Sequence, residues 1–212
     1  MRFFDELRKE HEIIEGVLGA LRTWARGLEA GEDTAEDGAR FLRFFRIYAG
    51  ELHHDREEAI LFPALENAGL PSRGPIATIV ADHHAMAQTL GDLEEALTAG
   101  DRVGVSRLAR DYSHALWSHI DAETSVLFPE SESRLEKKGI RDLPLREPTS
   151  SERKVLADAA RLTAAYPPTE PDTVRGDGCV FCHAYGDTCR GIEGEWWNEW
   201  EWEELDDHIA SS

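Results

Sequence analysis

Apolar residues recur at helical spacing through most of the first 138 positions. They follow one another at steps of three, four or seven residues, which places them on one face of each helix. In the first segment this face contains Phe4, Leu7, Ile14, Leu18, Leu21 and Leu28. Turns rich in glycine or proline separate the segments, which are expected at about 2–29, 36–67, 72–99 and from the Gly100-Asp101 break to about 138. Helices joined by short connections pack antiparallel, so the pattern predicts an all-α, up-down antiparallel four-helix bundle over residues 1–139.

Each predicted helix also has a histidine within its apolar face. These residues are His11, His53, His83 and His119. In the second and fourth helices a glutamate follows four residues later, on the neighbouring turn of the same face. These glutamates are Glu57 and Glu123. The whole string, His-x-x-x-Glu followed by a leucine and then Phe-Pro, occurs at 53–63 and again at 119–129.

The two halves of the predicted bundle form an internal duplication. An acid precedes both His11 and His83, and apolar residues follow each at +3 and +7. The first histidines are offset by 72 residues and the His-x-x-x-Glu strings by 66, which fits a longer connection in the first half. The first and third helices therefore each place one histidine inward, and the second and fourth each place a histidine and a glutamate inward.

A single histidine on a helix face is more often a packed or partly exposed side chain than a metal ligand, but the repeated register favours a shared role for these six residues. A buried carboxylate without a partner is costly, and a pair of cations between the carboxylates would remove that cost. Four imidazoles and two carboxylates suit iron, and also manganese or zinc.

Other polar residues adjoin the two strings. His54 and His84 lie one residue, about 100°, off the proposed face, so each is expected either to support a ligand from behind or to face solvent. Direct metal binding is the less favoured alternative for these two residues and for His114. His114 is expected to point away, and Glu58 is interpreted as solvated surface, with chelation as the alternative. The Leu-Phe-Pro strings are expected to pack in the core and to end their helices.

With this doubled string, the chain resembles the hemerythrin-like, His-His-Glu cation-binding family over about residues 5–135. The other di-iron bundles, the ferritin-like proteins, use Glu-x-x-His spacing, which is absent at these positions. The resemblance implies two iron ions with an oxo or hydroxo bridge. It also implies that Glu57 and Glu123 bridge the ions and that the four histidines are terminal ligands.

One departure from the oxygen-carrying hemerythrins affects the expected function. Those proteins take a fifth histidine from His-x-x-x-His on the third helix and an aspartate at one carboxylate position, whereas here Ala87 follows His83 and both carboxylates are glutamates. The site is therefore expected to react with O₂, peroxide or nitric oxide rather than to carry O₂, and peroxide decomposition is the leading hypothesis. The alternative is a non-enzymatic oxygen or iron sensor, or an iron store, that signals through the C-terminal segment.

Composition limits the partners. The net charge is −19, and residues 166–212 contain 12 acidic and 2 basic residues, so neither nucleic acid nor an anionic membrane is expected to bind. No run approaches the roughly 20 apolar residues that a membrane-spanning helix needs. The N-terminus is charged from its second residue and has no signal-peptide core, so a cytoplasmic protein is expected.

After the bundle, residues 140–171 are predicted to form a linker with a short helix, capped by Ser150 or Ser151 and ending near 165. Residues 172–212 form an acidic segment rich in cysteine and tryptophan. Its possible second metal or redox site consists of Cys179, Cys182, His183 and Cys189. One zinc ion, with His183 or His208 as fourth ligand, is the leading interpretation; c-type haem attachment, a redox dithiol and free thiols are the alternatives.

The tryptophan-rich tail at 195–205 is expected either to dock on the rest of the chain or to present an aromatic, acidic surface to a protein partner or a second copy.

Overall fold

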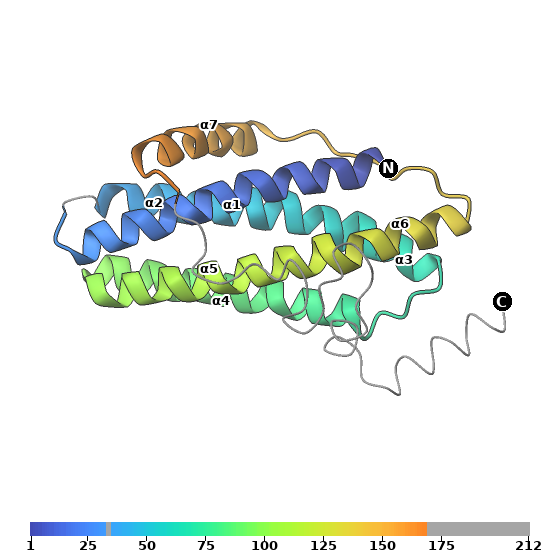
Figure 1. The fold of residues 1–212 in the computed structure, drawn as a ribbon, viewed down its shortest axis with the longest axis horizontal. Helices are drawn as coiled ribbons and strands as arrows, with labels where there is room; N and C mark the ends of the chain where they lie inside the picture. Colours follow the sequence, from blue (N-terminus) through green and yellow to red (C-terminus); the bar gives the residue numbers. More distant parts are fainter. Residues whose placement is uncertain (33–34, 169–212) are drawn as a thin grey trace, which may run out of the picture.

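The computed structural model describes residues 1–32 and 35–168, and every regular element in this part of the chain is helical (Figure 1). The first bundle helix is α1 (Arg2–Glu29), and the third is α4 (Pro75–Ala99). Successive bundle helices run in opposite directions, as Figure 1 shows. The prediction of an all-α, antiparallel four-helix bundle is therefore confirmed.

The second bundle helix is a continuous run of four elements. These are α2 (Ala35–Phe44), η1 (Phe45–His54), η2 (Glu57–Leu61) and α3 (Phe62–Asn67). The fourth bundle helix is built in the same way. It consists of α5 (Arg102–Ala122), η3 (Glu123–Leu127) and α6 (Phe128–Lys137).

The η elements are π-helical, and two of them occupy equivalent places in the two halves. η2 and η3 each begin at the glutamate of the repeated string and end just before Phe-Pro. Pro63 and Pro129 have no N–H, so the carbonyl four residues earlier loses its α-helical partner, and a wider turn accommodates this loss. The expectation that Phe-Pro ends each helix is wrong, because α3 and α6 continue the same helices beyond it.

Turn chemistry sets the ends of the third helix. Gly74 has a φ of 71° and Pro75 occupies the first turn, so α4 begins at Pro75 rather than at the expected residue 72. The helix ends at Ala99, and the next residue, Gly100, adopts the left-handed conformation with a φ of 69°. Asp101 then caps α5 by accepting a hydrogen bond of 2.9 Å from the backbone N–H of Gly104.

The apolar core has two parts, with the histidines and glutamates between them. In the first helix, Leu7 belongs to one cluster and Ile14 to the other, with His11 between them. In the third helix, Ile79 and Met86 flank His83 in the same way. The predicted ligands therefore form a polar layer between two apolar layers.

A further helix, α7 (Ser150–Ala165), packs on the bundle (Figure 1). Val155, Ala159 and Leu162 are buried within the larger apolar cluster. The expected cap at Ser150 or Ser151 is wrong: Thr149 caps the helix, and its side chain and that of Glu152 form a reciprocal capping box.

The predictions for residues 172–212 fall outside the described residues. They concern the cysteine segment (Cys179, Cys182, His183 and Cys189) and the tryptophan-rich tail. Among the residues that the structure does describe, no helix is both long enough and apolar enough to span a bilayer.

Candidate metal centre

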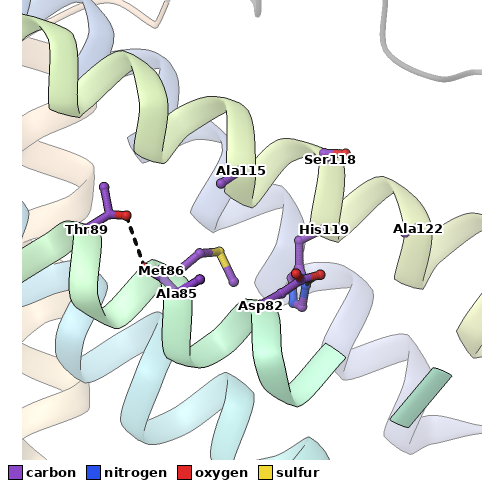
Figure 2. A pocket seen from close by; sticks show the side chains of 8 residues that line it. All are labelled: Asp82, Ala85, Met86, Thr89, Ala115, Ser118, His119 and Ala122. Atoms are coloured by element: carbon purple, nitrogen blue, oxygen red, sulfur yellow. Dashed lines mark hydrogen bonds and ion pairs between the residues drawn. The ribbon is translucent and has the colours of Figure 1, made fainter. Parts of the chain in front are cut away.

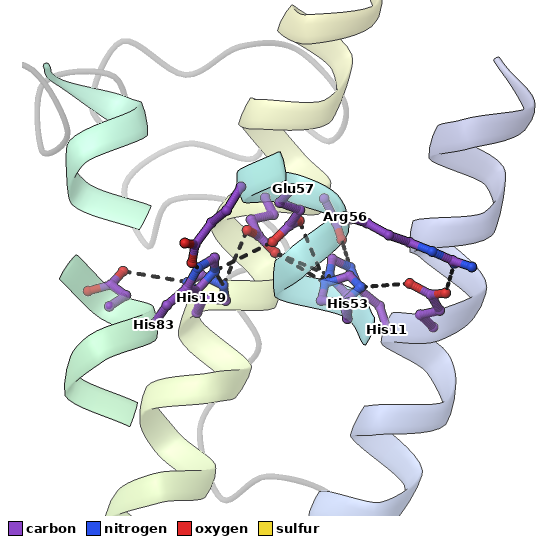
Figure 3. Close-up of polar contacts among 11 residues, drawn as sticks. His11, His53, Arg56, Glu57, His83 and His119 are labelled. Carbon is purple, nitrogen blue, oxygen red and sulfur yellow. Dashed lines mark hydrogen bonds and ion pairs between the residues drawn. The ribbon is translucent and has the colours of Figure 1, made fainter. Parts of the chain in front are cut away.

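The six residues of the repeated pattern converge in the polar layer between the two apolar clusters. Their donor atoms form two groups, within each of which all atoms lie within 4.8 Å of one another. One group contains His11, His53, Glu57 and Glu123; the other contains His83, His119 and the same two glutamates. Figure 3 shows one histidine pair on each side of Glu57. Each of the six side chains is at least 95% buried.

Within each pair the imidazoles approach each other through equivalent atoms. The Nε2 atoms of His11 and His53 lie 2.9 Å apart, and those of His83 and His119 lie 3.1 Å apart. Two unprotonated Nε2 atoms at such a distance repel each other through their lone pairs. Each pair therefore needs a proton or a metal cation between its nitrogens.

Glu57 lies between the two pairs. Its Oε1 atom lies 3.6 Å from the Nε2 atom of His53, and its Oε2 atom lies 3.4 Å from the Nε2 atom of His83. Both oxygens are buried and have no hydrogen-bond partner among the described residues. A buried carboxylate with two free oxygens is costly unless a cation binds it.

Glu123 takes the mirrored position. Its Oε2 atom lies 3.1 Å from the Nε2 atom of His11, and its Oε1 atom lies 3.2 Å from the Nε2 atom of His119. Both glutamates therefore direct one oxygen toward each histidine pair, which is the arrangement of a carboxylate shared by two cations.

The Nδ1 atoms of His53 and His119 face acids that occupy equivalent places in the two halves of the duplication. The Nδ1 atom of His53 lies 2.9 Å from a carboxylate oxygen of Glu10, the acid that precedes His11. The Nδ1 atom of His119 lies 3.6 Å from Asp82, the acid that precedes His83. A carboxylate within hydrogen-bond distance, as Glu10 is, selects the tautomer that leaves Nε2 free to bind a metal.

The first histidine of each half takes its partner from the opposite half. The Nδ1 atom of His83 lies 2.7 Å from Glu58, and that of His11 lies 2.9 Å from the hydroxyl of Thr124. Glu58 is an exposed residue behind His83 and belongs to neither group of converging donors. Three of the four imidazoles therefore have a carboxylate behind them, and His11 has a neutral hydroxyl.

The protonation of the metal-free site is uneven. Burial opposes charge on His53 and His119, but the carboxylates beside them outweigh this effect and raise the pKa of each to about 10. Burial and the neighbouring His53 lower the pKa of His11 to about 4. Burial and Glu123 raise the pKa of Glu57. Protons therefore occupy part of the site without metal, and metal binding has to displace them.

His54 takes the buried one of its two expected positions, next to the predicted ligand His83. It is buried, its ring stacks on His83 with the centroids 3.8 Å apart and the planes within 8°, and its Nε2 atom has no hydrogen-bond partner in the described part of the chain. With His83 and His119 it forms a third group of converging donors. It ends the π-helical η1, whose smaller rotation per residue turns it further inward than an α-helix would.

The two other histidines of the described residues differ from His54. His84 is exposed, as one of its two expected positions requires. His114 is half-buried and belongs to none of the groups of converging donors found among the described residues.

A surface pocket of about 260 Å³ reaches the back of the site between α4 and α5 (Figure 2). Asp82 and His119 both line it, beside Met86 and the exposed Ser118. The gap of 3.6 Å between His119 Nδ1 and Asp82 is longer than a direct hydrogen bond. The Asp82 side chain is 49% exposed whereas Glu10 is 2% exposed, so the acid behind His119 is closer to solvent than the acid behind His53.

Comparison with known proteins agrees with this geometry. A family model described as the hemerythrin HHE cation binding domain matches residues 2–131, more than half of the chain. No curated protein and no solved structure matches the chain. The matched region contains all six converging residues and both repeated strings, and the chain belongs to the hemerythrin HHE cation-binding domain family.

Proposed function

We propose that the polar layer holds two iron ions, one at each histidine pair, with both glutamates shared between them. The terminal ligands are His11 and His53 on one side and His83 and His119 on the other, and the shared ligands are Glu57 and Glu123. The observation that carries the proposal is the position of the carboxylates, since each directs one oxygen to each pair.

The residues present fit a pair of cations. The donor set is mixed nitrogen and oxygen, which suits iron and also accommodates manganese or zinc. Both Glu57 oxygens and one Glu123 oxygen are buried without a hydrogen-bond partner among the described residues. Two positive ions satisfy these oxygens and relieve the close approach of the Nε2 atoms at the same time.

The surroundings support reaction with a small ligand. When bound, an iron pair supplies electrons and open coordination positions for O₂, peroxide or nitric oxide. The chain offers each cation two nitrogens and one oxygen from each of two carboxylates, which leaves positions for such a ligand. The apolar layers on both sides exclude bulk water, and the partners at Nδ1 hold the imidazoles in place.

Peroxide removal tests the enzymatic form of the proposal. Iron-loaded protein is expected to remove peroxide faster than a variant with both His53→Ala and His119→Ala, and its optical spectrum is expected to change when peroxide or O₂ is added. Equal rates for the two proteins would exclude the enzymatic function.

The second candidate is a non-enzymatic oxygen or iron sensor, or an iron store. Hydrogen bonds favour the sensor. They run from His53 through Glu10 and Arg56 to Arg146, and the Arg146 side chain pairs with Glu152 in the first turn of α7, the last described helix before residues 169–212. A sensor is expected to change its spectrum with O₂ or peroxide without turning peroxide over. A spectrum that responds to neither, together with reversible iron uptake, favours storage.

A further inference from the structure

A buried ion pair lies directly behind His53. One oxygen of Glu10 accepts from the Nδ1 atom of His53 at 2.9 Å, and the Arg56 guanidinium donates to the other oxygen (Figure 3). Both Glu10 and Arg56 are 2% exposed. Because both oxygens of Glu10 are engaged, the position of Arg56 determines the position of the carboxylate, and the carboxylate orients the imidazole.

Arg56 is held in turn by a residue beyond the family match. Its second terminal nitrogen donates to the backbone carbonyl of Arg146 at 2.8 Å. The Arg146 side chain donates to both oxygens of Glu152 at 2.8 Å each, and to the backbone carbonyl of Glu51 at 2.7 Å. This bidentate pairing fixes both the distance and the angle between the Arg146 guanidinium and the Glu152 carboxylate. Because the side chain of Arg146 is fixed, the backbone carbonyl of Arg146 that accepts from Arg56 is fixed as well.

We propose that Arg146 and Glu152 are positioning residues for His53, and through it for the half of the metal centre formed by His11 and His53. This inference rests on the proposed two-cation function. Neither residue lies within 2–131, the region that the family model matches. The segment that follows the bundle is therefore part of the support of the metal centre.

The other half of the centre has weaker support of this kind. Asp82, which faces His119, has a side chain that is 49% exposed and lies 3.6 Å from the Nδ1 atom. Loss of the Arg146–Glu152 pair is therefore expected to act on one cation and not on both. This selectivity distinguishes a positioning role from a general loss of stability.

Anaerobic titration with iron(II), followed by calorimetry, tests the proposal on the full chain. Wild-type protein is expected to bind two equivalents. In Arg146→Gln the Kd of one equivalent is expected to rise about tenfold to a hundredfold, the usual effect of losing a group behind a ligand, while the other stays unchanged. The control is Arg43→Gln, which breaks the Arg43–Asp158 pair that also ties α7 to the bundle, and it is expected to leave both equivalents unchanged.

Two further variants make the result decisive. Glu152→Gln breaks the same pairing with less change in shape and is expected to weaken the same equivalent. Combining Glu10→Gln with Arg146→Gln is expected to weaken binding no more than Glu10→Gln alone, since both act through one chain of contacts. Additive losses, or equal weakening of both equivalents, would overturn the inference.

Nitrogen NMR of the histidine rings gives a readout that needs no metal. In metal-free Arg146→Gln the resonances of His53 are expected to shift, and those of His83 are not. Unchanged His53 resonances, together with wild-type binding of two equivalents by Arg146→Gln, would contradict this inference alone. Failure of the wild-type protein to bind two equivalents would instead contradict the proposed function.

Discussion

The Nε2 atoms of His11 and His53 lie 2.9 Å apart in a buried layer, although the two residues are 42 positions apart in the chain. Packing of apolar side chains does not require such an approach, because two imidazole lone pairs repel each other at this distance. A proton between them converts the repulsion into one hydrogen bond, and a metal cation converts it into two favourable bonds. The same contact recurs between His83 and His119, so both halves of the duplicated bundle have the same requirement.

Replacing Glu57 is expected to stabilise the metal-free protein while it weakens metal binding. Burial and Glu123 raise the pKa of Glu57, so its ionised form opposes folding at pH values above the unfolded pKa. Glu57→Gln removes that charge and is expected to increase the free energy of unfolding without metal by about 1 to 3 kcal/mol at pH 7. Denaturant unfolding and metal analysis measure the two effects. A variant that loses stability and keeps its metal would contradict the assignment.

His54 is expected to influence the His83 and His119 half from its stacked position. Its unpartnered Nε2 atom belongs to a group of donors with these two residues. His54→Ala is therefore expected to change the optical spectrum of the iron-loaded protein and to weaken one iron equivalent. His84→Ala, at an exposed residue of the same type, is the control and is expected to change neither. Identical spectra for both variants would show that His54 only fills space.

Most of the fold follows from the periodicity of apolar residues, because helix faces in a bundle are set by local spacing. The inward position of His53 and Glu57 follows from the same spacing. The inward position of His54 does not follow from this spacing. It depends on the π-helical element η1, whose hydrogen-bond pattern differs from that of an α-helix. Spacing alone places that residue one step off the face.

Contacts between residues far apart in the chain are the second feature that the spacing of residues does not predict. The duplication shows an acid before each first histidine, but only the folded chain shows that Glu10 pairs with His53 rather than with its neighbour. The cap of α7 could be placed only within a residue or two, since threonine and serine at 149–151 all suit that role.

The Arg146–Glu152 pair is expected to make stability depend on pH. The hydrogen bonds from Arg146 hold the pKa of Glu152 below its ordinary value of 4.5. The ionised Glu152 therefore contributes to the free energy of unfolding above about pH 4.5. This contribution is lost as the pH falls through the lower pKa that Glu152 has in the folded protein. Glu152→Gln is expected to destabilise the protein by about 1 to 2 kcal/mol at pH 7, with the difference shrinking toward pH 3. A difference that is constant with pH would mean that the charge on Glu152 contributes nothing.

Phe128 is expected to stabilise the layer next to the metal centre. Its ring is fully buried, stacks on His11 with the centroids 5.2 Å apart and packs against Phe4. Phe128→Ala is expected to lower the free energy of unfolding by about 3 to 5 kcal/mol, through lost burial and the cavity that remains. Val103→Ala, at a residue that is 67% exposed, is the control, with an expected change within about 0.5 kcal/mol. Chemical denaturation of the metal-free proteins measures both, and a Phe128→Ala change as small as the control would contradict this role.

Anomalous X-ray diffraction from crystals of the iron-loaded protein, recorded at the iron absorption edge, tests the central claim most directly. Two peaks are predicted in the polar layer, one beside His11 and His53 and one beside His83 and His119, with Glu57 and Glu123 between them. No peak in this layer, or iron bound only elsewhere on the chain, would contradict the account.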